Sequence, residues 1–183
     1  MAIKETEVTE KLQAIHDKYK GLVKNPGAKT VYMMSPWWTD KQQEHILASY
    51  EALVQNPNIA HVSVPLFHQF NGQAYVDGGD FKPDFMWATK TYQSDKESMN
   101  NAQVGVLLET PTDPDAGSEY EAGYMTGQGK PVVAVYNGDI NDPNSPVNLM
   151  ISFGTSSYVT EYEELKNFDF IDIPMKEFKG QIV

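Results

Sequence analysis

The chain has 183 residues, a length that corresponds to about one domain. It carries 25 acidic and 14 basic residues, and the formal net charge of −11 argues against binding to nucleic acid or an anionic membrane. It contains no Cys, which excludes disulfides, thiol nucleophiles and Cys-ligated metal centres. All 14 basic residues are Lys, and the absence of Arg, the usual bidentate clamp for phosphate, favours an uncharged polar ligand.

The first 28 residues are predicted to form an N-terminal helical extension. Leu12, Ile15 and Tyr19 follow helical spacing within a helix expected over residues 5–24, and Asn25-Pro26-Gly27 ends it. This segment has no apolar run of the kind found in a signal peptide, and no stretch of the chain approaches 18 apolar residues. We therefore expect a cytoplasmic protein that does not contact membranes, with the main domain spanning residues 29–183.

Strands and helices alternate through that domain. Thr39 and Gln42 have the spacing of a capping box, which predicts a helix that begins there and ends at Asn56-Pro57. Further helices are expected over 84–100, 118–128 and 147–153. Five short strands are expected over 30–34, 61–65, 104–108, 132–136 and 158–160. Because the strands are nearly continuous apolar runs, the pattern indicates an α/β fold with a parallel five-stranded sheet and helices on both faces.

Ligands of such folds bind beyond the carboxyl ends of the strands. The loops that follow Met34, Pro65, Glu109 and Tyr136 are therefore the expected place for chemistry. The loop over residues 66–83 is long for a compact domain, which favours a functional role. Standard motifs are missing: Gly129-Lys130-Pro131 does not complete a P-loop, no G-x-S-x-G is present, and the four His residues have no zinc-ligand spacing.

Three carboxylates remain as candidates for catalysis. Asp115 follows the third strand, Glu121 lies in the next helix, and Asp95 lies in the helix that leads into that strand. A carboxylate can attack an anomeric carbon while a second acid protonates the leaving group, so this set, with aromatic residues Tyr32 and Trp37 nearby, points to glycosyl chemistry.

Each candidate also has a purely structural interpretation. Ser118 and Glu121 have the spacing of a capping box, which would by itself explain Glu121. Asp115 suits a turn, and Asp95 suits a solvated helix face. The other candidate residues also have structural interpretations: a core position for Tyr32, core or ligand stacking for Trp37-Trp38, and a helix start for Asn148.

In these residues the sequence resembles the nucleoside 2-deoxyribosyltransferases. Six segments carry the resemblance, in order and with compatible spacing, between about residues 29 and 170. They are Tyr32–Asp40 (YMMSPWWTD), Val64–Gln69 (VPLFHQ), Trp87–Asp95 (WATKTYQSD), Asp115–Tyr124 (DAGSEYEAGY), Gly129–Val133 (GKPVV) and Val147–Met150 (VNLM). The resemblance implies a flavodoxin-like fold and transfer of 2-deoxyribose from a 2′-deoxyribonucleoside to a free purine or pyrimidine base.

The resemblance also implies roles for individual residues. Glu121 would be the nucleophile that forms a covalent glycosyl-enzyme, Asp95 would assist protonation of the base, and Tyr32 would orient Glu121. The substrate-binding residues would be Asp115 for sugar hydroxyls, Gln69 for the base and Asn148 for a sugar hydroxyl in the site of a neighbouring subunit. Trp37 and Met150 are also expected to bind substrate. It implies a homo-oligomer, a hexamer in this family, and neither a metal nor another cofactor is expected.

The sequence departs from the family at three places. Met34 stands where Gly is usual, and Glu119 stands where Gly or Ala is usual and could raise the pKa of Glu121. The chain ends in Gln181-Ile182-Val183 instead of an aromatic residue. Two alternative functions stay open: a deoxynucleoside hydrolase of the same fold, and a nucleoside-binding domain without catalysis.

Overall fold

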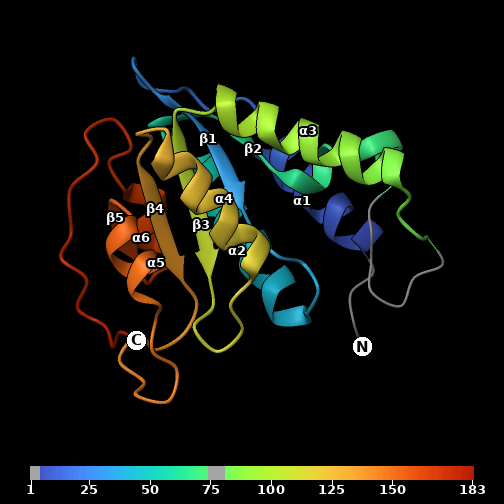
Figure 1. The fold of residues 1–183 in the computed structure, drawn as a ribbon. Coiled ribbons are helices and arrows are strands. Elements are labelled where there is room, and N and C mark those ends of the chain that lie inside the picture. The colour runs from blue at the N-terminus through green and yellow to red at the C-terminus, as the bar shows by residue number, and fades with distance from the viewer. Residues whose placement is uncertain (1–4, 74–80) are drawn as a thin grey trace.

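The computed structural model describes residues 5–73 and 81–183 of the chain. It contains one five-stranded sheet in the order β2-β1-β3-β4-β5, and all four pairs of neighbouring strands are parallel (Figure 1). The expected parallel α/β architecture is therefore confirmed. The strands are β1 (Lys29–Met34), β2 (Ile59–Ser63), β3 (Val104–Glu109), β4 (Val132–Tyr136) and β5 (Ser157–Val159).

Helices cover both faces of the sheet (Figure 1). One face carries α1 (Glu5–Tyr19), α2 (Asp40–Gln55) and α6 (Tyr162–Asn167). The opposite face carries α3 (Phe85–Asn101), α4 (Ala116–Gly127) and α5 (Leu149–Gly154). This arrangement is a flavodoxin-like fold.

The larger apolar core lies between the sheet and the α1–α2–α6 layer. Val8 and Leu12 of α1 are fully buried in it, so the N-terminal helix packs on the domain. The capping box of α2 is present: the Thr39 side chain accepts from the Gln42 backbone, and Gln42 accepts from the Thr39 backbone. Alternate residues of β1 face the other layer, which places Tyr32 and Met34 beneath α3 and α4.

Several boundaries differ from the prediction. The first helix ends at Tyr19, and β2 begins two residues early, at Ile59. Helix α6 was missed because its six residues are too few to display a clear helical period. In the loop over 66–83, two short 3₁₀ turns cover Pro65–Phe67 and Phe70–Gly72, while residues 74–80 lie outside the described part of the chain. None of the described helices is long and apolar enough to cross a membrane.

Candidate active site

The centre of the candidate site is a hydrogen bond between β1 and α4. The Tyr32 hydroxyl donates to Oε1 of Glu121 over 2.8 Å. Tyr32 is fully buried, and its backbone is fixed because β1 pairs with strands on both sides. The sheet therefore holds the phenol in place, and the phenol holds one oxygen of the Glu121 carboxylate.

The capping-box interpretation of Glu121 is wrong. Helix α4 begins at Ala116, and its N-cap is Asp115, whose Oδ2 accepts from the Ser118 backbone over 2.7 Å and from the Ser118 hydroxyl over 2.9 Å. Glu121 thus lies in the second turn, too far along for a capping role, and its carboxylate bonds to Tyr32. Asp115 caps the helix through one oxygen only, and Oδ1 accepts no hydrogen bond from any described residue.

Asp95 brings a second acid to this centre from α3. Its Oδ1 is buried and has no hydrogen-bond partner among the described residues. Burial raises the pKa of Asp95 to about 7. The interpretation of Asp95 as an ordinary solvated acid does not hold, because a buried oxygen without a partner is unusual in a folded protein.

Burial also dominates the chemistry of Glu121. It raises the pKa of Glu121 to about 8, the Tyr32 hydrogen bond acts to lower it, and the charges of Asp95 and Asp115 raise it further. Glu119, which was expected to raise this pKa, is not among the causes. The charge of Glu119 acts instead on Glu109.

Glu109 is the residue that the sequence interpretation missed. It is the last residue of β3 and only 4% exposed, and burial together with Glu119 and Asp115 raises its pKa to about 7. Its register partner on β4 is Tyr136, whose buried hydroxyl has no partner among the described residues. A carboxylate that ends an apolar strand run was a signal available in the sequence.

Met34 lies in the same apolar cluster as Tyr32, beneath α3 and α4. It is fully buried, and its methyl group lies over Gly105 of β3, where an added Cβ would come within 2.3 Å of it. Gly105 therefore makes the room that Met34 needs. The departure at Met34 is matched by a small residue on the neighbouring strand.

Gln69 and Trp37 lie outside this hydrogen-bonded centre. Gln69 is buried, and its amide donates to the backbone oxygen of Pro65 over 3.1 Å. Trp37 packs partly against the larger core, with its ring 5.0 Å from that of Trp38 between centroids. Trp38 is 41% exposed. The pair therefore extends from the core to the surface.

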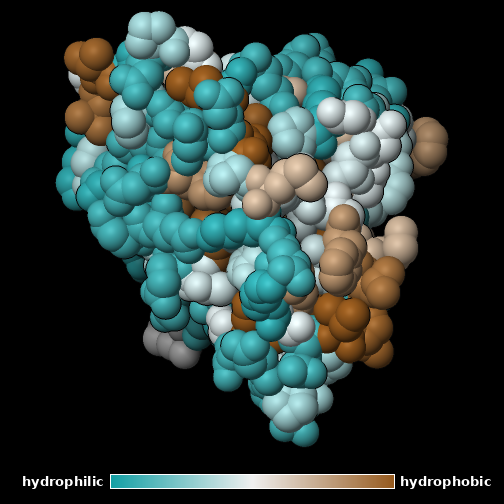
Figure 2. Space-filling model, turned by 90° about the vertical axis from the view of Figure 1, so that its left-hand side faces the viewer, coloured by the Kyte–Doolittle hydropathy of each residue, from teal (hydrophilic) through white to brown (hydrophobic). Residues whose placement is uncertain are grey.

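Asn148 and Met150 lie on the outer surface of α5. Asn148 is its N-cap and accepts from the Met150 backbone over 2.9 Å, so its structural interpretation as a helix-start residue is confirmed. Met150 is 73% exposed. Figure 2 looks onto the side of the molecule that carries α5 and shows apolar side chains gathered at its lower right. Exposed apolar residues of α5 and the C-terminus are Leu149, Met150, Phe153, Ile182 and Val183.

The site thus joins a buried carboxylate, a phenol that orients it and a second buried acid. Such a set can form and break a bond at an anomeric carbon. Within residues 5–73 and 81–183, no three His, Asp or Glu side chains are placed to hold a metal ion.

The chain is similar to several known proteins. The family model described as Nucleoside 2-deoxyribosyltransferase matches residues 31–150. A nucleoside deoxyribosyltransferase of Lactobacillus leichmannii is 36% identical over 146 residues, which are 78% of this chain and 90% of the relative. A nucleoside deoxyribosyltransferase of Lactobacillus johnsonii is 30% identical over 139 residues, 75% of this chain and 91% of the relative.

Solved structures support the fold. A 2-deoxyribosyltransferase from Bacillus psychrosaccharolyticus superposes with a TM-score of 0.64 at 24% identity, covering 81% of this chain and 98% of that one. A conserved protein from Enterococcus faecalis V583 gives a TM-score of 0.55 at 18% identity, covering 75% of this chain and 94% of that one. With the matched residues spanning β1 to the start of α5, this chain belongs to the nucleoside 2-deoxyribosyltransferase family of enzymes.

Proposed function

We propose that this enzyme transfers 2-deoxyribose from a 2′-deoxyribonucleoside to a free nucleobase through a covalent ester on Glu121. The observation that carries the proposal is the buried carboxylate of Glu121, held by the Tyr32 hydroxyl at 2.8 Å beside Asp95, whose Oδ1 has no partner within the described part of the chain. Such an exchange attaches a free base to the sugar of an existing nucleoside, so that no free 2-deoxyribose is released.

In the first half-reaction, the ionised carboxylate of Glu121 attacks C1′ of the donor nucleoside. The glycosidic C–N bond breaks, and its electron pair leaves with the base, which takes a proton from the carboxyl group of Asp95. The Tyr32 hydrogen bond stabilises the ionised form of Glu121 and fixes which oxygen is free to attack.

In the second half-reaction, a nitrogen of the incoming base attacks C1′ from the face that the first base left. The ester C–O bond breaks, its electrons return to Glu121, and the proton of the incoming base passes to Asp95. Two inversions retain the β configuration. The proposed cycle begins and ends with one proton shared by the two acids.

The remaining residues are assigned to substrate binding. Oδ1 of Asp115 is available for a sugar hydroxyl, since the capping bonds use Oδ2. Gln69 and Trp37 are assigned to the base. A neutral nucleoside suits this site, because Glu109, Asp115 and Glu119 would repel a phosphate group.

We also propose that the active form is a homo-oligomer, a hexamer as in the family, in which Asn148 and Met150 complete a neighbour's site. The exposed apolar residues of α5 and the C-terminus support this proposal, because a surface of that kind commonly pairs with another protein surface. The cap of α5 fixes Asn148 at the edge of this surface.

The first experiment is a chromatographic assay with thymidine or 2′-deoxyinosine as donor and excess adenine as acceptor. Transfer predicts formation of 2′-deoxyadenosine by the native enzyme. Glu121→Gln removes the nucleophile and is expected to lower kcat by about 10³-fold or more. Glu119→Gln, two residues earlier on the same helix, is the matched control and is expected to stay within about threefold of the native rate.

The products distinguish the alternatives. Free 2-deoxyribose without 2′-deoxyadenosine would identify a hydrolase, while nucleoside binding without turnover would identify a binding domain. Intact mass spectrometry with donor alone should detect a deoxyribosyl adduct, and peptide mapping should assign it to Glu121.

Complementation tests the shared site. Glu121→Gln and Asn148→Ala should each be inactive alone, whereas co-expression of both variants should form some sites with a native Glu121 and a native Asn148. Recovered activity supports sharing between subunits. A monomeric native enzyme with full activity would contradict it.

A further inference from the structure

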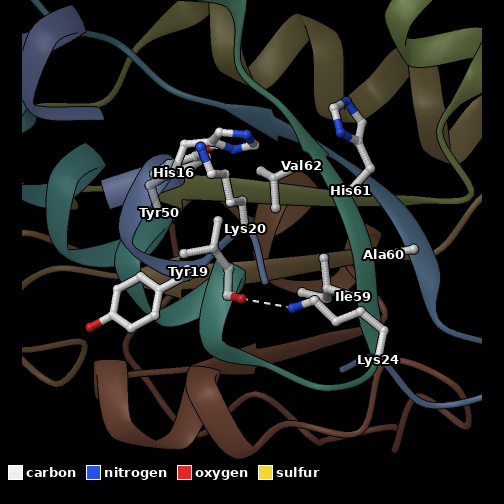
Figure 3. A pocket seen from close by; sticks show the side chains of 10 residues that line it. His16, Tyr19, Lys20, Lys24, Tyr50, Ile59, Ala60, His61 and Val62 are labelled. Atoms are coloured by element: carbon white, nitrogen blue, oxygen red, sulfur yellow. Dashed lines mark hydrogen bonds between the residues drawn. The ribbon is translucent and has the colours of Figure 1, made fainter. Parts of the chain in front are cut away.

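A pocket of about 210 Å³ lies away from the proposed catalytic acids Asp95 and Glu121, between the end of α1 and the edge of the sheet (Figure 3). Its walls come from α1 and the turn that follows, from α2, and from β2, which pairs with β1 along one side only. It belongs to the α1–α2–α6 side of the sheet, whereas Tyr32 and Glu121 lie on the other. Nothing in the proposed reaction uses it.

The titratable residues that line this pocket are basic, whereas the whole chain has a net negative charge. The chain has 25 acidic residues and 14 Lys, yet two Lys and two His line the pocket, and none of the described residues that line it is Asp or Glu. Figure 3 shows His16 and Lys20 on the α1 side and Lys24 opposite them. The His61 ring lies on the other side of β2 from Val62 and points away from the cavity. Local electrostatics therefore favour an anion here.

The cationic groups are held by the fold. Lys24 donates to the backbone oxygens of Val54 and Asn56 over 2.7 and 3.1 Å, which fixes its ammonium at the carboxyl end of α2. His16 is one helical turn before Lys20, and its Nδ1 lies 3.3 Å from the Tyr50 hydroxyl.

Two carboxylates beside the pocket, those of Asp17 and Glu51, are already paired with lysines. Asp17 pairs with Lys20 over 3.2 Å at the exposed surface, where ion pairs contribute little and exchange easily. Glu51 is engaged by Lys18 and by the Tyr19 hydroxyl. Neither Asp17 nor Glu51 lines the pocket.

We propose that this pocket binds inorganic phosphate or a small phosphate monoester. The volume lies below the range of about 300–1,000 Å³ that is usual for larger ligands, so a compact anion fits better than a whole nucleotide. Donors on α1 and on the turn that follows it approach from different directions, which suits a tetrahedral anion better than a planar carboxylate. Lys binds phosphate as a point charge and does not need the planar fork of Arg.

This site belongs to the chain's own N-terminal segment. His16, Lys20 and Lys24 all precede residue 31, where the match to the family model begins. The inference is therefore independent of the proposed transfer, and its test needs no catalytic assay.

The test is calorimetric titration of the full chain with inorganic phosphate at constant ionic strength. Saturable binding with one site per chain is expected, and both Lys20→Gln and Lys24→Gln should weaken it by about fivefold or more. Lys18→Gln is the matched control: it removes the same charge two residues before Lys20, and Lys18 does not line the pocket. Its affinity for phosphate should stay within about twofold of the native value.

Nuclear magnetic resonance of the four His rings locates the bound anion. Phosphate should move the ring signal of His16, assigned by its His16→Gln variant, and should leave the signals of the buried His45 and of His61, whose ring points away from the pocket, unchanged. No saturable binding, equal affinity in Lys20→Gln, or equal loss in Lys18→Gln would overturn the proposal. A glucose 6-phosphate titration then separates phosphate alone from a phosphate monoester.

Discussion

Two buried polar side chains on the α1–α2–α6 face are fully hydrogen-bonded, whereas two buried acids on the opposite face are not. On the α1–α2–α6 face, Asn56 is fully buried and donates to the backbone oxygens of Leu165 and Phe168 over 3.0 and 2.9 Å. His45 is also buried there, with Nε2 3.0 Å from the Val135 oxygen and Nδ1 2.9 Å from the Tyr162 hydroxyl. These groups bond to parts of the chain that are distant in sequence and thereby stabilise the fold.

On the α3–α4 face, two buried acids have incomplete hydrogen bonding. Among the described residues, Oδ1 of Asp95 has no partner and Glu121 bonds only to the Tyr32 hydroxyl. Burial raises the pKa of both acids to about 7 and about 8. The difference teaches that a satisfied buried group marks structure, while an unsatisfied acid marks a place where a substrate completes the bonding.

Among the substitutions that test this difference between the faces, Asp95→Asn is expected to have the largest effect, a loss of kcat. The amide keeps the shape of the side chain but cannot deliver a proton, so kcat should fall about 10²–10⁴-fold. Steady-state kinetics should show the loss, and donors whose bases leave without protonation should be affected least. A rate within about threefold of the native one would remove Asp95 from the mechanism.

Asn56→Ala tests the other face. It leaves the oxygens of Leu165 and Phe168 without their donor and should lower the free energy of unfolding by about 2–4 kcal/mol. Urea denaturation measures this change. The pH profile of kcat/KM should remain native, and a shifted profile would show that the two faces are coupled.

The pH profile itself should be bell-shaped. In the proposed mechanism the active form carries one proton on the Asp95–Glu121 pair, so kcat/KM should fall below about pH 7, where both acids are protonated, and above about pH 8, where both are ionised. These two limits belong to the coupled pair. A profile that is flat from pH 6 to 9 would contradict the shared proton.

Tyr32→Phe should shift this profile. The hydroxyl lowers the pKa of Glu121, the higher of the two values, so its removal raises that pKa and moves the upper limit of the profile to higher pH. At pH 7 the rate should fall about tenfold, because less of Glu121 is ionised. A lower rate with no movement of the upper limit would indicate misplacement of the carboxylate instead of a lost hydrogen bond.

The smallest expected effect is a gain in stability from Glu109→Gln. The pKa of Glu109 is raised in the folded state, so its favourable contribution is complete below pH 4.5 and is lost as the pH rises through about 7. The variant should therefore be more stable than the native enzyme by about 1–2 kcal/mol at pH 8, with little difference at pH 4.5. Glu97→Gln on the exposed side of α3 is the control and should change neither value.

Much of the fold was predictable because its signals are local. Val132–Tyr136 is a run of apolar residues between turn signals, and its bounds as a strand match the prediction. The helix after Thr39 was predicted from its capping box. Helix α6 and the start of α4 were not, since six residues carry no period and Ser118 offers the same capping pattern as Asp115.

The candidate site was predictable only in part. The six segments that resemble the family named Tyr32, Asp95, Asp115 and Glu121, and the structure brings these four to one layer. Glu109 was missed because its burial depends on α4 and β4 packing beside it. The roles of Gln69, Trp37, Asn148 and Met150 stay predictions.

The sequence by itself determined the alternation of strands and helices, the parallel sheet and the choice of candidate carboxylates, because these follow from local periodicity and from short motifs. Only the tertiary structure decided that Glu121 bonds to Tyr32 instead of capping its helix, that Glu119 acts on Glu109, and that a cationic pocket forms beside β2. The physical reason is that burial and electrostatic interactions depend on distance in space, and residues 32 and 121 become neighbours only when the sheet and α4 pack together.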